Sequence, residues 1–248
     1  LRELRTAVVG RRVRRELRAL LPEDREAFLQ AMEEMFTLSR EDGLARYGPA
    51  FKTSEYFVHL HNVWAGARDC DHLHQGKGFL NNHLALTLEF EQSMQMINPA
   101  LTMPYWDYTL ESHDVLKNHG GDLDAVWSSE IFRPEFFGDA DPVEHTVTEG
   151  RWAHKLRVAG DQWDNQRRNS YGLMRAPWNN NPSPYVQRFR ELSGSPLWNY
   201  NDGWPTCKDH YEVSVAHPTF TEYLARLPGW AHGTVHAVMG GAINPDGR

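Results

Sequence analysis

The sequence contains few cysteines and no long apolar run. Its 248 residues include only two cysteines, Cys70 and Cys207, which excludes a small fold held together by several disulfide bonds. No segment approaches the run of about 18 apolar residues that a transmembrane helix needs, so we expect no membrane span. Hydrophobic residues still make up 40% of the chain, and we therefore expect one globular domain over residues 1–248.

Positive charge is also scarce. The net charge of -7 argues against a nucleic-acid partner, because phosphate binding requires clustered lysine and arginine side chains. One basic cluster stands out, and we interpret it as a solvated face beside a helix. It consists of Arg11, Arg12, Arg14, Arg15 and Arg18.

Helical periodicity dominates the first part of the chain, about residues 21–96. Apolar residues such as Phe28 and Met32 are spaced four apart, as on one face of a helix. A further helix is predicted over residues 81–96, and its apolar stripe includes His83. Strand-like alternation is not found, so these patterns predict a mainly α fold.

The middle of the chain, about residues 109–218, has a different composition. Many tryptophans lie there among glycine, proline and asparagine, and the segment at residues 179–184, Asn-Asn-Asn-Pro-Ser-Pro, interrupts any regular element. We expect a loop-rich insertion with short helices over the helical core. Helical character then returns, and after a break at Pro228 and Gly229 a new helix carries His232 and His236.

Five histidines form two spaced groups. His232 and His236 are four residues apart on one helix face, with Cβ atoms about 5–6 Å from each other, so both imidazoles can reach one ion. Upstream, His61, His74 and His83 could supply a second site with three imidazoles. A set of ligands that contains only nitrogen suits copper, zinc, iron or nickel and disfavours magnesium and calcium.

Recognisable motifs surround these histidines. Upstream are Tyr56-Phe-Val-His-Leu-His61-Asn62, then Phe79-Leu80, Phe90-Glu91 and Pro104-Tyr-Trp-Asp107, and downstream His232-Gly-Thr-Val-His236 precedes Gly240-Gly241. Their order and spacing resemble those of the tyrosinase, catechol oxidase and molluscan haemocyanin family of type-3 copper proteins. In that family, the Pro-Tyr-Trp-Asp motif fixes a loop, and the phenylalanines line the copper-bearing helices.

The resemblance implies an antiparallel four-helix-bundle core that holds two copper ions, Cu A and Cu B. The third Cu B histidine of the family lies on a following helix, which would come after Arg248. We therefore expect a copper domain that is incomplete at its C-terminal end, with a downstream polypeptide supplying that ligand. The implied ligands are His61, His74 and His83 for Cu A, and His232 and His236 for Cu B.

Three assignments in this set have alternatives. His59 competes with His61, which we favour because Asn62 follows it as in bacterial members. His72 competes with His74, which we favour because its spacing to the third ligand is that of the family. Cys70-Asp-His72 resembles the Cys-x-His motif that forms a thioether in other members, so Cys70 is thioether-linked, disulfide-bonded to Cys207 or a free thiol.

The implied function is that of a copper-dependent oxidoreductase that uses dioxygen to oxidise phenols or o-diphenols to o-quinones. Asn82, Leu84 and Gly233 depart from the family pattern, and Glu222 is only a substitute for the glutamate that orients a water near Cu B. Oxidation of diphenols is therefore favoured over hydroxylation of monophenols. The alternatives are a non-catalytic or assembly subunit and a haemocyanin-like dioxygen carrier. Family members are often secreted or stored in organelles, which favours such a compartment.

Overall fold

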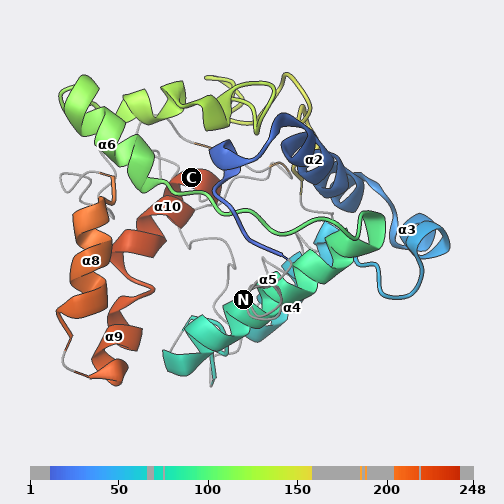
Figure 1. The fold of residues 1–248 in the computed structure, drawn as a ribbon, viewed down its shortest axis with the longest axis horizontal. Coiled ribbons are helices and arrows are strands. Elements are labelled where there is room, and N and C mark those ends of the chain that lie inside the picture. Colours follow the sequence, from blue (N-terminus) through green and yellow to red (C-terminus); the bar gives the residue numbers. More distant parts are fainter. Residues whose placement is uncertain are drawn as a thin grey trace, which may run out of the picture. The chain divides into compact units, whose positions relative to one another are not determined.

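The computed structural model describes residues 12–65, 70–74, 76–157, 185, 188, 204–217 and 219–240. This part of the chain is mainly helical, as the sequence predicts, and the β structure described in it is limited to isolated bridges (Figure 1). None of its helices has both the length and the apolar composition that a bilayer crossing requires. The antiparallel four-helix arrangement stays a prediction.

The α-helices follow the order of the sequence and are joined by loops and short 3-10 turns. They are α2 (Pro22–Thr37), α3 (Arg40–Tyr47), α4 (Ser54–Ala65), α5 (Gly76–Ile97), α6 (Thr109–Asn118), α8 (Cys207–Val215), α9 (Phe220–Arg226) and α10 (Trp230–Gly240). The 3-10 turns are η1 (Leu17–Ala19), η2 (Leu123–Ser128) and η3 (Glu130–Phe132).

Contacts divide the chain into two compact units. Unit 1 comprises Leu1–Ser54 and Ala85–Asp107, and unit 2 comprises Glu55–Leu84 and Tyr108–Arg248. Because the division falls within α5, the first part of that helix belongs to unit 2 and the rest to unit 1.

Unit 1 is built around α2. Pro22 at its first turn presets the helical φ angle, and the acidic residues that follow suit the positive end of the helix dipole. Phe28, Leu29 and Met35 then lie buried on one face of the helix, where they form part of the core.

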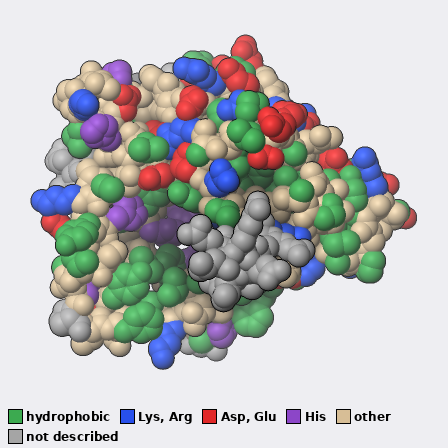
Figure 2. Space-filling view, in the orientation of Figure 1, with side chains coloured by type: hydrophobic (Ala, Val, Ile, Leu, Met, Phe, Trp, Pro, Cys, Tyr) green, Lys and Arg blue, Asp and Glu red, His purple; other side chains and the backbone are tan. Residues whose placement is uncertain are grey.

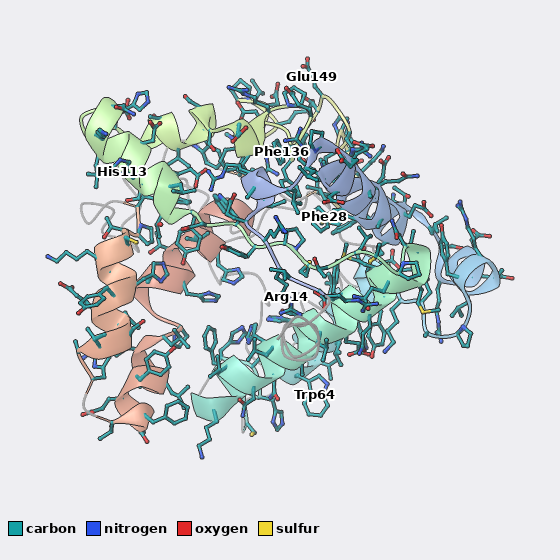
Figure 3. All side chains as sticks on the ribbon, in the orientation of Figure 1. Arg14, Phe28, Trp64, His113, Phe136 and Glu149 are labelled. Atoms are coloured by element: carbon teal, nitrogen blue, oxygen red, sulfur yellow. The ribbon has the colours of Figure 1, made fainter. Side chains whose placement is uncertain are left out.

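An extended segment, residues 12–16, is bound to the chain that follows α5. A parallel bridge pairs Glu16 with Tyr105, and the side chain of Arg14 binds the Glu91 carboxylate with Nε 2.9 Å from Oε2 (Figure 3). The Arg12 guanidinium donates to the Pro99 carbonyl oxygen at 3.0 Å. Arg12 and Arg14 are exposed, in agreement with the interpretation of the basic cluster as a solvated face, and both also bind acceptors distant in the sequence.

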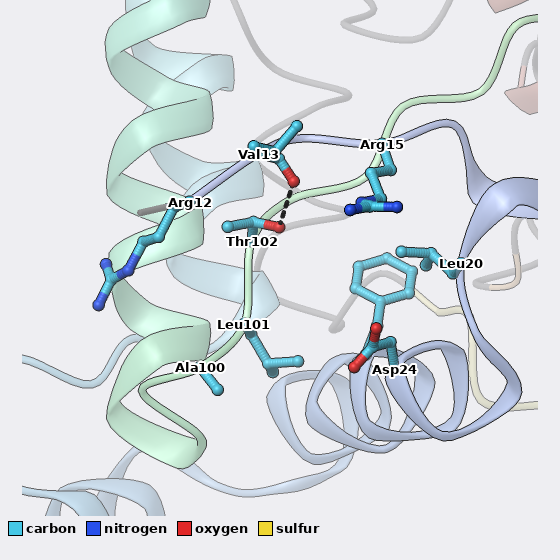
Figure 4. A pocket seen from close by; sticks show the side chains of 9 residues that line it. Arg12, Val13, Arg15, Leu20, Asp24, Ala100, Leu101 and Thr102 are labelled. Carbon is cyan, nitrogen blue, oxygen red and sulfur yellow. Dashed lines mark hydrogen bonds between the residues drawn. The ribbon is translucent and has the colours of Figure 1, made fainter. Parts of the chain in front are cut away.

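A pocket of about 240 Å³ lies within unit 1 (Figure 4). Phe28 and Leu101 line it together with the charged side chains of Arg15 and Asp24. At its edge the Thr102 hydroxyl donates to the carbonyl of the extended segment at 3.1 Å, as the dashed line in Figure 4 marks. None of the five candidate histidine ligands lines this pocket.

Unit 2 has its own aromatic core. Trp127 and Phe132 have ring centroids 4.9 Å apart, and Phe136, which is labelled in Figure 3, is fully buried, as is Trp152. The Arg188 guanidinium donates to the Phe137 carbonyl at 3.1 Å and lies over the Phe132 ring. The described portion of residues 109–218 holds short helices and loops, and the loop-rich insertion over the core stays a prediction; residues 179–184 lie outside the described residues.

Capping boxes fix where two helices in the C-terminal part of unit 2 begin. α8 and α9 each begin with a capping box, in which a threonine and the acid three residues later bind each other's backbone. α9 ends at Arg226, and α10 begins at Trp230 after the proline and glycine, so the predicted break is confirmed (Figure 1).

Candidate metal centre

Three histidines converge in unit 2. His61 lies on α4, His74 on the loop before α5, and His83 on α5 itself. One nitrogen from each imidazole can be chosen so that all three lie within 4.8 Å of one another. The ring centroid of His61 lies 5.1 Å from that of His74 and 5.7 Å from that of His83. The fold therefore brings the three candidate ligands of the first group, predicted from the sequence, into one cluster.

Asp71 fixes the orientation of His74. Its Oδ2 lies 3.0 Å from Nδ1 of the imidazole, while Oδ1 accepts hydrogen bonds from the backbone N–H groups of Leu73 and His74, both at 2.9 Å. The carboxylate thus binds the ring and the loop that carries it. With Nδ1 engaged, Nε2 of His74 is the nitrogen available to a metal ion.

His83 is oriented by its own helix. Nδ1 of its ring lies 2.7 Å from the Phe79 carbonyl oxygen, one turn earlier in α5. Because a carbonyl oxygen only accepts, this nitrogen carries the proton and leaves Nε2 free to bind a metal. His74 and His83 therefore offer the same kind of donor atom.

The loop that carries His74 approaches α5 closely. A Cβ atom added to Gly78 would lie 2.3 Å from the carbonyl oxygen of His72, so only glycine allows this approach. The same carbonyl oxygen accepts a hydrogen bond from Nδ2 of Asn82 at 2.6 Å. Asn82, one of the departures from the family pattern, therefore holds the loop against the helix.

The second histidine group lies on α10. The rings of His232 and His236 have centroids 4.4 Å apart, as the four-residue spacing predicts. The ring centroid of His83, in the first group, lies 6.4 Å from that of His232. The ring centroid of the buried Phe79 lies 4.9 Å from each of these two. The two groups therefore face each other beside one aromatic side chain. Figure 2 shows histidine side chains, in purple, near hydrophobic side chains, in green.

The environment keeps the imidazoles of His61 and His232 neutral. Burial, together with the neighbouring imidazoles of His74, His83 and His236, lowers the pKa of His61 to about 4. Burial and the adjacent histidines also lower the pKa of His232 to about 4. Neutral imidazoles are the form that binds a metal, so no proton has to be displaced near neutral pH.

The pKa values of His83 and His236 are lowered as well. Burial lowers the pKa of His83, although its hydrogen bond to the backbone acts in the opposite sense. His236 keeps exposed surface on one side, yet the protein around its ring lowers its pKa, as do His83 and His74. Each histidine group therefore contains neutral imidazoles that can bind a cation.

Copper fits this set of donors. Bonds of about 2.0 Å place two ligand nitrogens at most about 4 Å apart, and the nitrogens of the first group lie within 4.8 Å of one another in the absence of an ion. Imidazole nitrogens without carboxylate or thiolate suit copper in either of its oxidation states. Within the described residues, no third histidine, cysteine or acid joins His232 and His236 in a comparable cluster.

The competing residues have other surroundings. His72 packs edge-on against Trp64, with ring centroids 4.9 Å apart, and the exposed His59 does not belong to the cluster. Cys70 and Cys207 are both free thiols, and Sγ of Cys70 lies 3.7 Å from Nδ1 of His72. These positions support the choice of His61 and His74 without testing metal binding itself.

Glu222 is engaged in the cap of α9. Its Oε2 accepts from the backbone N–H of Thr219 at 3.1 Å and from the hydroxyl of that residue at 2.8 Å. A catalytic role for Glu222 therefore stays a prediction, and it would compete with these hydrogen bonds. The residue that sequence reasoning missed is Asp71, whose position three residues before His74 was the available signal.

Comparison with known proteins agrees with this geometry. A family model, the common central domain of tyrosinase, matches residues 52–246. The chain belongs to the tyrosinase family. Members of this family are copper oxidoreductases, and the matched range includes all five candidate ligands.

Individual relatives in the tyrosinase family are distant. Grixazone synthase of Streptomyces griseus is 30% identical over 82 residues, which are 33% of this chain and 23% of that protein. Tyrosinase of Streptomyces antibioticus is 25% identical over 156 residues, 60% of this chain and 49% of that protein. The putative tyrosinase-like protein tyr-3 of Caenorhabditis elegans is 28% identical over 133 residues, 54% of this chain and 16% of that protein. The chain thus spans about half the length, or less, of these curated relatives.

Proposed function

We propose that this chain oxidises o-diphenols to o-quinones with dioxygen at a pair of copper ions. His61, His74 and His83 would hold the first ion, and His232 and His236 would contribute to the second. The observation that carries the proposal is the approach of the two histidine groups, with His83 and His232 6.4 Å apart beside Phe79. Two ions held this close can act on one small molecule together.

The reaction is a two-electron oxidation. The diphenol loses two electrons and two protons, and each dioxygen oxidises two diphenol molecules as it is reduced to water. Copper, when bound, supplies the redox chemistry that no side chain offers. The protein contributes ligand geometry, in which Asp71 and the Phe79 carbonyl hold His74 and His83 so that Nε2 of each ring is available.

Diphenols are the favoured substrates because they demand less of the protein. A monophenol is a weaker acid, and its hydroxylation benefits from a base or an oriented water near the metal. Glu222 is the candidate for that task, but its carboxylate caps α9. We therefore propose catechol-type turnover, with little or no activity on monophenols.

The second copper site calls for a third ligand beyond His232 and His236. We propose that a further imidazole provides it, since the only cluster of possible ligands found among the described residues is that of His61, His74 and His83. Free imidazole offers a direct test, since it can fill a vacant coordination position. Added imidazole should tighten binding of the second copper equivalent and leave the first unchanged; an effect on both equivalents alike would contradict the proposal.

Catechol oxidation tests the proposed reaction. The copper-loaded chain, with and without imidazole, should consume dioxygen and form o-quinone in a ratio of one to two, and the copper-free chain should do neither. Exposed His113 on α6 offers a matched control, because His113→Ala should behave as the unaltered chain.

Other outcomes identify the alternatives. Reversible dioxygen binding without quinone formation would indicate a dioxygen carrier. Failure to take up a second copper under any condition would indicate a non-catalytic or assembly subunit. Either result would overturn the proposal.

A further inference from the structure

Tyr108 connects the start of α6 to the helix that carries the second histidine group. Its hydroxyl donates a hydrogen bond to the backbone carbonyl of Ala231, which immediately precedes His232 in α10. These residues are separated by more than a hundred positions in the sequence but lie in the same unit. The contact reaches the first turn of α10, where a change of backbone position would move the His232 ring.

The Tyr108 side chain is itself held on two sides. Its ring centroid lies 5.3 Å from that of His210 on α8 and 6.2 Å from that of Trp204, which meets it edge-on. The indole N–H of Trp204 donates to the backbone carbonyl of Tyr108 at 2.9 Å. Trp204 is buried, and its own carbonyl accepts from the Ser112 hydroxyl of α6 at 3.2 Å.

Aromatic and hydrogen-bond contacts of this kind restrict rotation of the ring, so the hydroxyl has a defined direction. The Ala231 carbonyl also belongs to the first turn of a helix, where it can accept from the N–H four residues later. A second donor on the same oxygen therefore ties the helix backbone to a fixed group.

We propose that Tyr108 is a positioning residue for the second metal site: its hydroxyl bond to Ala231 fixes the first turn of α10 and thereby sets where His232 faces His83. The proposal rests on the proposed function for its metal-binding consequence, but not for its effect on the metal-free helix. Trp204 and His210 serve by holding the Tyr108 ring.

Hydrogen exchange of the metal-free chain tests the structural half of the proposal. Tyr108→Phe removes only the hydroxyl, and amide exchange in α10 should accelerate about two- to tenfold, as expected for the loss of one net hydrogen bond. Exchange in α4 and α5 should stay unchanged. Tyr211→Phe is the matched control, because Tyr211 is exposed on the neighbouring α8. Unchanged α10 exchange, or equal acceleration throughout the chain, would overturn the proposal.

Copper binding tests the functional half. In a His61→Ala background, where the first group is broken, Cu(II) bound by His232 and His236 should show an altered electron paramagnetic resonance spectrum when Tyr108 is also replaced by phenylalanine. Its affinity should fall by up to about tenfold. An identical spectrum and affinity would contradict the positioning role. If the unaltered chain binds no second copper, the proposed function fails, while the exchange experiment still decides the role of Tyr108.

Discussion

In unit 1, the Glu91 carboxylate is matched to donors: it accepts from Arg14 at 2.9 Å and from the Met103 backbone N–H at 2.7 Å. In unit 2, by contrast, no described residue makes a hydrogen bond with the ring of the largely buried His61, although His74 and His83 lie next to it. Glu91 is thus satisfied by hydrogen bonds within its own unit. His61 lies among other imidazoles instead, and its ring nitrogens can bind a metal ion.

The net pKa is lowered in both units, with opposite effects on charge. Burial alone raises the pKa of Glu91, but the hydrogen bonds from Arg14 and Met103 outweigh it and the net pKa is lowered, which keeps the group charged. Burial lowers the pKa of His61 and of His232, and the opposing effect of Asp71 on His61 is smaller, so both groups stay neutral. A charged, paired group stabilises a fold, whereas a cluster of neutral imidazoles is typical of a cation-binding site.

Loss of a candidate ligand should have the largest effect. His83→Ala leaves the first group with two imidazoles, so we expect the first copper equivalent to be lost and catechol oxidation to fall by about 100-fold or more. Metal analysis after gel filtration and oxygen uptake measure the two effects. Retention of both copper and activity would remove His83 from the site.

Glycine substitutions compare the two units directly. In Gly78→Ala the new Cβ would meet the His72 carbonyl oxygen at 2.3 Å, displacing the loop of His74, and copper affinity should fall about tenfold. In Gly43→Ala the new Cβ would instead meet the Phe51 ring at 2.2 Å, which should cost about 1–3 kcal/mol of unfolding free energy.

Copper titration and thermal unfolding distinguish the Gly78→Ala and Gly43→Ala variants. Gly43→Ala should bind copper normally once folded, because its clash lies in unit 1. Equal losses of copper affinity in the two variants would show that general destabilisation, rather than the position of the loop, controls the metal site.

Removal of the Glu91 carboxylate should destabilise unit 1. Glu91→Ala leaves the Met103 N–H and the partly exposed Arg14 side chain without their acceptor, at a cost of about 1–2 kcal/mol after allowance for solvent screening. Exposed Gln92 on the same helix provides the control variant Gln92→Ala, which should change the midpoint of urea denaturation little. Equal midpoints for both variants would contradict this account.

Acid should affect the two units in separate pH ranges. The unfolded chain protonates histidines as the pH falls below about 6.5, whereas His61 and His232 in the folded chain do so only near 4, so the metal-free protein loses stability across this interval. The Glu91 contribution should be lost only as the pH falls below its ordinary value of 4.5. Urea midpoints against pH measure both, and His61→Gln should flatten only the upper range.

Local patterns predicted much of the fold. The four-residue spacing of His232 and His236 and the break at Pro228 and Gly229 depend on neighbouring residues, and α10 has the expected form. The start of α5 at Gly76, earlier than predicted, could not be read from apolar spacing. The close approach of the His72 carbonyl to Gly78 is likewise a contact of the folded loop that apolar spacing does not indicate.

Long-range partners were harder to predict. The exposed side chains of Arg12 and Arg14 bind the Pro99 carbonyl after α5 and the Glu91 carboxylate of α5, two acceptors that no local pattern indicates. Tyr108 carries no spacing signal that connects it to Ala231. In both cases, the acceptor lies far away in the sequence, and only the fold brings donor and acceptor together.

The most direct test of the metal site is a count of the imidazoles around the first bound copper. Electron spin echo spectroscopy on the chain loaded with one equivalent of Cu(II) detects the remote nitrogens of coordinated imidazoles. The account predicts three coordinated imidazoles, reduced to two in His61→Ala, His74→Ala or His83→Ala and unchanged in His113→Ala. A first copper with fewer imidazoles, or one whose count is insensitive to these three histidines, would contradict it.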